Sequence, residues 1–146
     1  MIVMNEDYAE QIGMSLEVYQ RPETLISAQF IGSLAMNIFD AHIHSQAFRI
    51  SEKSIGDGSM PNCKVTLGIR SEHLVPSPSG PLTTNINNIE PLGANTHLHG
   101  NLKQSGQKIT VSLPGVHELD KIEREMSFEV NRENIHLFYS TNGQRL

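Results

Sequence analysis

Hydrophobic periodicity changes once along this chain, near position 37 of its 146 residues. Beyond that point helical periodicity almost vanishes, and short runs rich in β-branched residues alternate with clusters of Gly, Pro, Asn and Ser. These clusters recur roughly every ten residues, a spacing that is typical of all-β domains. Because the runs are short and numerous, the sequence predicts a mostly β fold, a small barrel, over residues 37–146.

The expected strands lie at residues 37–45, 47–50, 64–70, 82–92, 96–102, 108–113, 126–131 and 135–139. Two stretches, 51–62 and 75–81, are rich in Gly, Pro and Ser, so we expect exposed and disordered loops there. The charge run 117–125 (HELDKIERE) predicts a solvated turn or short helix, and we assign no site to it.

The first 36 residues have a different pattern, which predicts strands followed by two short helices. The apolar start, residues 1–4, suits a buried strand, and residues 10–13 suit a second extended piece. Ser15 stands where a helix N-cap would, and Pro22 ends that helix. A second helix follows Pro22 and ends at Gly32.

Charge and composition exclude several classes of protein. The net charge of -5, from 11 basic and 16 acidic residues, disfavours binding to nucleic acid or anionic lipid. The single Cys63 cannot form an internal disulfide, and the acidic N-terminus is unlike a signal peptide. No window reaches the roughly 18 to 20 apolar residues of a membrane-spanning helix. We therefore expect a cytoplasmic chain that reaches a membrane only through a partner.

Motifs of catalysis are absent from the sequence. It contains no G-x-x-x-x-G-K-S/T phosphate loop, no G-x-S-x-G elbow, no H-E-x-x-H pair and no C-x-x-C. Acidic residues are scattered in turn-like contexts, which does not favour a pair of carboxylates for acid and base catalysis. The sequence thus predicts no enzymatic activity, no catalytic residue and no bound cofactor.

Two pairs of histidines, His42 with His44 and His97 with His99, are the most plausible metal ligands. On a strand, residues i and i+2 point to the same face, where two imidazoles could hold a metal. A metal site usually needs a third and a fourth ligand, and none is spaced nearby. We therefore favour polar histidines on the outer face of the barrel, and expect no metal site.

Arg70 and Glu72 are also separated by two positions. They could form an anion site in which the acid orients the base. An exposed ion pair at the end of a strand is the simpler interpretation, and we favour it.

Four stretches, in order, cover nearly the whole chain: residues 2–37, LGIRSEHL (67–74), EPLGANTHLHG (90–100) and NIHLFYSTNGQRL (134–146). The first resembles the stretch that ends the ATPase domain of sugar-importer ABC ATPases of the maltose and glycerol-3-phosphate type. The others resemble the LGIRPEHL signature, the ExLGxxxxxxG strand pair and the HLFD-x-x-TG-x-RL ending of the regulatory domain that follows in that family. Leu34 and Ser71 replace Pro of the family pattern, and Tyr139 replaces Asp, which affects only local backbone rigidity.

The resemblance implies a division of the chain and a set of signature residues. Residues 1–36 would be the C-terminal remnant of an ATPase domain, and residues 37–146 an OB-like regulatory barrel of the TOBE or MOP type. The signature residues, for which the resemblance implies a structural or regulatory role, are Gly68, Ile69, Arg70, Glu72, His73, Gly93, Gly100 and His136.

The same resemblance implies a regulatory and dimerisation module of the ATP-binding subunit of a bacterial sugar or glycerol-3-phosphate ABC importer. In the family the phosphate loop, the signature motif and the sites of ATP and Mg lie upstream of the stretch that begins at Ile2, so this chain would not hydrolyse ATP. The implied partners are the ATPase domain, the membrane permease subunits and a regulatory protein. The chain would be peripheral to the inner membrane through the transporter.

Two alternatives remain open, as does the transported substrate. The barrels of a dimer could bind an oxyanion or metabolite at their interface, as related molybdate-binding barrels do, with amides near residues 33–37 and the Arg70 side chain as donors. The chain could instead be a gene fragment without a working partner.

The N-terminal segment also predicts an oligomer. Without an ATPase domain to cover them, its apolar side chains would have to pack on the barrel or on another copy. We therefore expect a homodimer or a higher oligomer, or an N-terminus that is rearranged from its position in the family. These side chains are Ile2, Val3, Ile12, Leu16, Tyr19, Leu25, Ile26 and Phe30.

Overall fold

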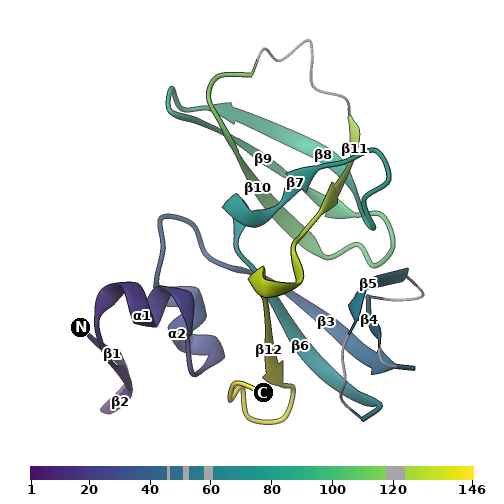
Figure 1. Ribbon diagram of the computed structural model, residues 1–146. Coiled ribbons are helices and arrows are strands. Elements are labelled where there is room, and N and C mark those ends of the chain that lie inside the picture. Colours follow the sequence, from purple (N-terminus) through teal and green to yellow (C-terminus); the bar gives the residue numbers. More distant parts are fainter. Residues whose placement is uncertain (46, 51–52, 58–60, 118–123) are drawn as a thin grey trace.

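The structure is a computed structural model that describes residues 1–45, 47–50, 53–57, 61–117 and 124–146 (Figure 1). In chain order its elements are β1 (Ile2–Asn5), β2 (Tyr8–Ile12), α1 (Ser15–Gln20), α2 (Leu25–Phe30), β3 (Asn37–His44), β4 (Ala47–Ile50), β5 (Lys53–Asp57), β6 (Cys63–Ile69), the 3₁₀ turn η1 (Ser71–His73), β7 (Val75–Pro76), β8 (Leu82–Pro91), β9 (Asn95–Leu102), β10 (Lys108–Pro114), β11 (Glu125–Glu129), the 3₁₀ turn η3 (Arg132–Asn134) and β12 (Ile135–Tyr139).

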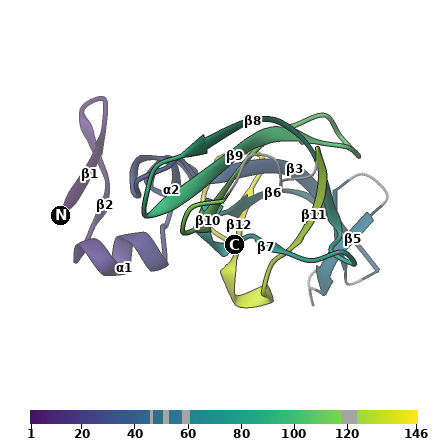
Figure 2. The same cartoon turned by 90° about the horizontal axis from the view of Figure 1, so that it is seen from above.

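Two five-stranded antiparallel sheets form most of the molecule. One has the order β10-β9-β8-β11-β7 and the other the order β12-β6-β3-β4-β5, while β1 and β2 form a separate hairpin. The hairpin and the two helices lie to one side of the sheets, an arrangement that is also visible from above (Figure 2). The prediction of a mostly β fold is confirmed, and the curled sheets are consistent with an OB-like barrel.

Strand β3 shows how the sequence builds the core between the sheets. Its residues alternate between buried and more exposed positions, the period expected of a strand with one face on a core. Removal of apolar surface from water stabilises the domain by about 25 cal/mol per Å². The largest fully buried apolar side chains of this core are Phe39, Phe48, Phe128, Ile43, Leu67, Ile69, Leu74, Leu82, Leu98 and Leu102.

Asn37 connects the two sheets by hydrogen bonds. It begins β3, and its Nδ2 donates to the carbonyl oxygen of Thr110 at 2.7 Å, while its Oδ1 accepts from the Thr110 N–H at 2.8 Å. Thr110 lies in β10, an edge strand of the other sheet. The side-chain amide thus pairs with an edge strand as a neighbouring backbone would.

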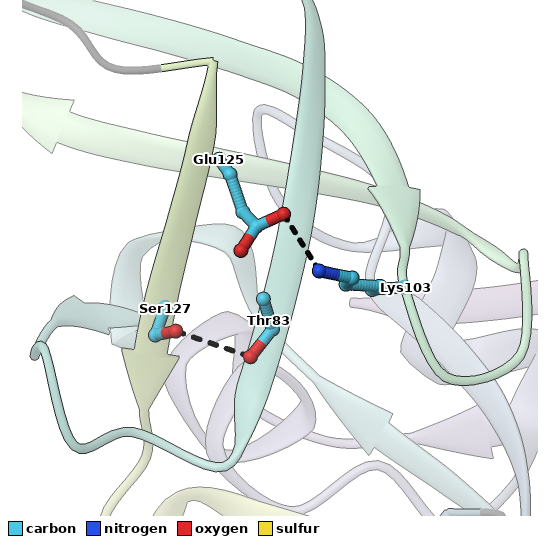
Figure 3. Close-up of polar contacts among 4 residues, drawn as sticks. All are labelled: Thr83, Lys103, Glu125 and Ser127. Carbon is cyan, nitrogen blue, oxygen red and sulfur yellow. Dashed lines mark hydrogen bonds and ion pairs between the residues drawn. The ribbon is translucent and has the colours of Figure 1, made fainter.

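Polar side chains connect β8, β9 and β11 on the outer surface (Figure 3). Thr83 and Ser127 lie opposite each other in β8 and β11, with their hydroxyl oxygens 3.1 Å apart. Lys103, just beyond β9, places its Nζ 2.9 Å from Oε2 of Glu125, and both side chains are more than half exposed. Because solvent screens such pairs, we expect this one to contribute little stability.

The prediction of loops was wrong in two places. Within 51–62, β5 pairs with β4 across a register shift at Phe48, and within 75–81, β7 pairs with β11. Pro76 is tolerated in β7 because that strand lies at a sheet edge, where its missing N–H deprives no neighbour of a bond. Positions 51–52 and 58–60 of the first predicted loop, and 118–123 of the charge run, lie outside the described residues.

The N-cap of α1 lies one residue before the position that the sequence predicts. Ser15 is the first residue of α1, and Met14 is its N-cap. The carboxylate of Glu17 accepts a hydrogen bond from the Met14 N–H at 3.2 Å, so the acid in the first turn supplies the stabilisation expected from Ser15. In the described part of the chain, no helix is long and apolar enough to cross a membrane.

Candidate functional site at the junction of the helices and the barrel

Arg70 holds the helical segment against the barrel. It follows β6, and only 2% of its surface is exposed. Its Nη1 donates to the carbonyl oxygen of Ile31 at 2.6 Å, and its Nη2 donates to that of Tyr19 at 2.9 Å. These carbonyls lie at the C-terminal ends of α2 and α1, where helices leave acceptors without partners. One guanidinium therefore satisfies both helix ends.

The ring of Tyr19 adds a second contact to this clamp. The Arg70 guanidinium carbon lies 3.9 Å from the centroid of the ring, within the range of a cation–π interaction. Burial lowers the pKa of Arg70 to about 10, so the side chain still carries its charge at neutral pH. Gly32 leaves room for it, because a Cβ there would lie 3.0 Å from Arg70 Nη1 and the residue has a φ of +122°.

The expected ion pair between Arg70 and Glu72 was wrong. Arg70 is buried and bound to backbone carbonyls, while the exposed Glu72 accepts a hydrogen bond from the Tyr19 hydroxyl. The two residues differ because the chain turns into η1 after Arg70, which separates their directions. Both nevertheless act on the same helix, since both contact Tyr19.

A cavity of about 330 Å³ lies beside the clamp, between α1 and the barrel. Helix α1 supplies Tyr19 and Gln20 to its wall, and the barrel supplies the rest. Its lining residues are Tyr19, Gln20, Arg70, His73, Glu133, Asn134 and His136.

His136 in β12 is a buried titratable group of this cavity. Only 5% of its surface is exposed, and its Nδ1 lies 3.0 Å from Nη1 of Arg145. Burial, with a smaller effect from the positive charges of Arg145, Arg70 and His73, lowers the pKa of His136 from 6.5 to about 4. The imidazole is therefore neutral at pH 7. Its Nδ1 accepts a hydrogen bond from Nη1 of Arg145.

The C-terminal tail fastens the same junction from the other side. The Arg145 N–H donates to the carbonyl oxygen of Glu23 at 2.8 Å, and the Leu25 N–H donates to that of Gly143 at 2.8 Å. A second, smaller core lies beneath these bonds, formed by Ala28, Met36 and Phe138 with Leu25 and Ile38 packed against it. The helices and the barrel thus share backbone bonds, a core and a buried cation.

Known proteins resemble this chain along its whole length. No protein-family model matches the chain. Three relatives named sn-glycerol-3-phosphate import ATP-binding protein UgpC match it throughout: 39% identical over 148 residues in Ruegeria sp. (strain TM1040), 36% over 147 in Ruegeria pomeroyi and 32% over 158 in Chromobacterium violaceum. The chain is homologous to the C-terminal part of these import ATP-binding proteins. It spans 41–42% of their length, and the family resemblance is confirmed.

The structure brings part of the family signature together at this junction. Arg70, His73 and His136 line the cavity, and Glu72 bonds the Tyr19 hydroxyl at its margin. Ile69 is buried in the main core. Gly68 lies under the smaller core, where a Cβ would lie 2.5 Å from the sulfur of Met36.

The two remaining signature glycines lie in the β8–β9 hairpin, away from the junction. Gly93 has a φ of +85° in the turn of that hairpin. Gly100 allows close approach of β8, because a Cβ there would lie 2.1 Å from the carbonyl oxygen of Asn85. Their constraints are those of a backbone, so they are structural positions.

Reasoning from the sequence missed the roles of Tyr19 and Arg145. Tyr19 was expected only as an apolar side chain, although it bonds both Arg70 and Glu72. Arg145 lies in the ending that resembles the family pattern, which was the one available signal. Nothing in its spacing indicates a partner at His136, nine positions earlier.

The paired histidines lie on strands as expected. His42 is half-buried and His44 exposed in β3, and both His97 and His99 are half-buried in β9. His99 Nε2 lies 2.7 Å from Oε1 of Glu90. Within the described residues, no three His, Cys, Asp or Glu side chains are grouped so that they could hold a metal ion.

Proposed function

We propose that this chain is the regulatory and dimerisation module of the ATP-binding subunit of a bacterial sugar or glycerol-3-phosphate importer. Its partners would be the ATP-binding part of such a subunit, the membrane permease subunits and a second copy of the module. ATP and Mg would bind outside residues 1–146, so the module would act through contacts and hydrolyse nothing. It would lie in the cytoplasm, at the inner membrane through the transporter.

The Arg70 clamp is the observation that carries the proposal. A rigid connection is one means by which the state of a regulatory domain can reach the domain that it controls. Residues 1–36 resemble the end of an ATPase domain, and Arg70 binds the C-terminal ends of both of their helices. A displacement of the barrel would therefore move α1 and α2 with it.

Exposed apolar side chains on the N-terminal segment support contact with a further protein surface. Ile12 is 71% exposed, Leu16 62% and Phe30 70%, while the buried side chains of the segment face inward. Where such side chains form one contiguous patch, that surface is a site of interaction with another protein or another copy. In a complete subunit the ATP-binding part would cover this face, and in the isolated chain a second copy would.

The test is the solution mass of the chain by light scattering after size exclusion, over a range of concentrations. We expect a dimer near twice 16.2 kDa. Combined Leu16→Ser and Phe30→Ser changes distinguish the contact surfaces, with Leu92→Ser as a matched control because Leu92 is 56% exposed in the β8–β9 turn. A monomer only in the double variant assigns pairing to the N-terminal face, and a persisting dimer assigns it to the barrel. A monomeric wild-type chain at every concentration would contradict the pairing role.

A further inference from the structure

We propose that residues 140–146 form a releasable strap. When the strap is closed, it joins the turn between the two helices, residues 21–25, to the barrel, and when it opens, it frees that turn. The Arg70 clamp holds the ends of the helices, whereas the strap holds the chain between them. This role deepens the proposed function and rests on it for the purpose of the coupling. The opening itself belongs to this chain and is tested without a partner.

The strap is hydrogen-bonded to the turn by its odd-numbered residues. The Arg145 N–H donates to the carbonyl oxygen of Glu23, and the Leu25 N–H donates to that of Gly143, each at 2.8 Å. These are backbone bonds of the kind that pair antiparallel strands. The turn is therefore attached to the strap as a short neighbouring strand would be.

The even-numbered residues of the strap bond the barrel, on its other side. The Tyr139 N–H donates to the carbonyl oxygen of Gln144 at 2.8 Å, and the Leu146 N–H donates to that of Leu137 at 2.9 Å. The strap turns back beside β12 to make these bonds (Figure 1). Because successive residues direct their bonds to opposite sides, the strap acts as a central strand between the turn and β12.

The side chains of the strap bury little surface. Residues 140–142 and Gln144 are exposed, and Gly143, Arg145 and Leu146 are half-buried. In β12, by contrast, Ile135–Phe138 are buried. Segments with few buried apolar contacts and with exposed backbone bonds open locally at a lower free energy than the core. We therefore expect the strap to open while the barrel stays folded.

Arg145 concentrates the polar contacts of the strap. Its Nη1 donates to the carbonyl oxygen of Pro22 at 3.3 Å and lies 3.0 Å from Nδ1 of His136 in β12. Its backbone N–H donates to Glu23, so one residue contacts the turn twice and the barrel once. Hydrogen bonds from a charged donor are stronger than neutral ones, and loss of this side chain should therefore favour opening.

A buried glutamine carries the connection from the turn to the β1-β2 hairpin. Gln11 lies in β2, and its Nε2 donates to the carbonyl oxygen of Arg21 at 3.1 Å, while its Oε1 accepts from the Glu23 N–H at 3.0 Å. Glu23 thus bonds the hairpin with its N–H and the strap with its carbonyl oxygen. When the strap opens, the turn and the hairpin stay joined to each other but lose these bonds to the barrel.

Hydrogen exchange of single amides in low concentrations of urea, read by NMR, tests whether the strap opens by itself. The reporters are the amides of Leu25, Arg145 and Leu146, whose bonds hold the strap, and the amides of β6 report global unfolding. We expect the reporters to exchange at least about tenfold faster than β6, with a weaker dependence on urea, because a local opening exposes less surface. Equal rates with the same urea dependence would overturn the strap as a separate unit.

A disulfide between the strap and the turn holds them closed. Thr24 and Gln144 lie opposite each other in an antiparallel bridge, and the two bonds between strap and turn flank this pair. Such a pair has Cα atoms about 4.5 Å apart, which a disulfide can span. In a Cys63→Ser background, Thr24→Cys with Gln144→Cys should slow exchange at Leu25 at least about tenfold when oxidised.

The reduced form of the same variant is the matched control for this disulfide. Thr24 also caps α2, since its Oγ1 accepts from the Ser27 N–H, and both forms share any effect of its loss. The exchange rate at Leu25 should return to the faster value on reduction. Equal rates in the oxidised and reduced forms would overturn the proposal that the turn is freed by opening of the strap.

Arg145→Met removes the side-chain contacts and keeps the backbone bonds. Exchange at Leu25 should rise roughly tenfold, through loss of the charged donor, while β6 amides keep their rate. Lys108→Met, at an exposed cation of β10, is the matched control and should change neither. An equal response of Leu25 to the two changes would contradict the part that Arg145 plays.

The effect on the hairpin is read from the distance between two spin labels, in the Cys63→Ser background. Asp7→Cys places one label at the exposed hairpin turn, and Glu129→Cys places the other on the exposed face of β11. The distribution of distances should widen when Arg145→Met is added, and an unchanged width would overturn the hold of the strap on the hairpin. Solution mass is a separate readout: a monomer whose strap opens contradicts only the pairing role, and a dimer whose strap never opens by itself contradicts only the strap.

Discussion

Arg70 holds Tyr19 by two contacts at once: its Nη2 donates to the Tyr19 carbonyl at 2.9 Å, and its guanidinium carbon lies 3.9 Å from the centre of the Tyr19 ring. A third contact, from Nη1 to the carbonyl oxygen of Ile31, extends the clamp to the second helix. Lysine cannot reproduce this arrangement, because its ammonium lacks the planar fork that reaches two acceptors and stacks on a ring. The junction thus depends on a guanidinium.

Arg70→Met should destabilise the chain by about 2 to 4 kcal/mol, because it leaves two part-buried carbonyls without this donor while it keeps much of the side-chain volume. Urea denaturation, followed by circular dichroism, measures the free energy of unfolding. Lys108→Met is the control, since Lys108 is an exposed cation at the start of β10. Equal effects of the two changes would show that the clamp is energetically neutral.

Asn37→Ala should cost about 2 kcal/mol, because it removes both bonds to the backbone of Thr110. Asn37→Asp is the more discriminating change. It keeps the acceptor for the Thr110 N–H but places a carboxylate oxygen against the Thr110 carbonyl, so we expect at least as large a loss at pH 7. Partial recovery below pH 4 would follow from protonation of the new acid, and a harmless Asp would contradict this role of the amide.

His136 makes the folded chain less stable as the pH falls. Its pKa is about 4 in the folded chain against 6.5 when unfolded, so the unfolded state binds the proton first as the pH falls. The stability that the neutral imidazole contributes to the folded chain is fully present above pH 6.5. It is lost as the pH falls from 6.5 to 4, by roughly 2 kcal/mol after allowance for solvent screening. The difference in unfolding free energy between the wild type and His136→Gln isolates it. A difference that does not change with pH would contradict the shift.

Three signature glycines should rank by the atoms that a new Cβ meets. Gly100→Ala should be the most damaging, because its Cβ would lie 2.1 Å from a backbone oxygen of β8 that the paired strand holds in place. Gly68→Ala should be milder, since the Met36 side chain can rotate away. Gly93→Ala meets no atom within 4 Å and should cost about 1 kcal/mol from its positive φ alone. Thermal unfolding midpoints test this order.

Short runs rich in β-branched residues, separated by clusters of Gly, Pro, Asn and Ser, predicted most strands of the two sheets. The prediction failed at two edge strands. Lys53–Asp57 and Val75–Pro76 are edge strands, and edge pairing depends on backbone bonds that leave almost no trace in hydrophobicity. Ser15 was misplaced for a similar reason, since either an N-cap side chain or a first-turn acid can satisfy a helix start.

The junction could be predicted only in part. Family resemblance marked Arg70, Glu72, His73 and His136, but local pattern predicted an exposed ion pair for the first two. A buried arginine that binds carbonyls 39 and 51 positions away leaves no periodic signal in the sequence. The same holds for Arg145 with His136, because long-range polar contacts are set by tertiary packing and not by spacing.

The most direct test of the account is amide hydrogen exchange in the helical segment, compared between the wild type and Arg70→Met. The reporters are the hydrogen-bonded amides of Val18 and Arg21 in α1 and of Ala28 and Ile31 in α2. If the clamp makes the segment and the barrel one unit, these amides exchange as slowly as barrel amides in the wild type. In the variant they should lose protection while amides of β3 and β6 keep it. Rapid exchange of the helices in the wild type, or full protection in the variant, would contradict the account.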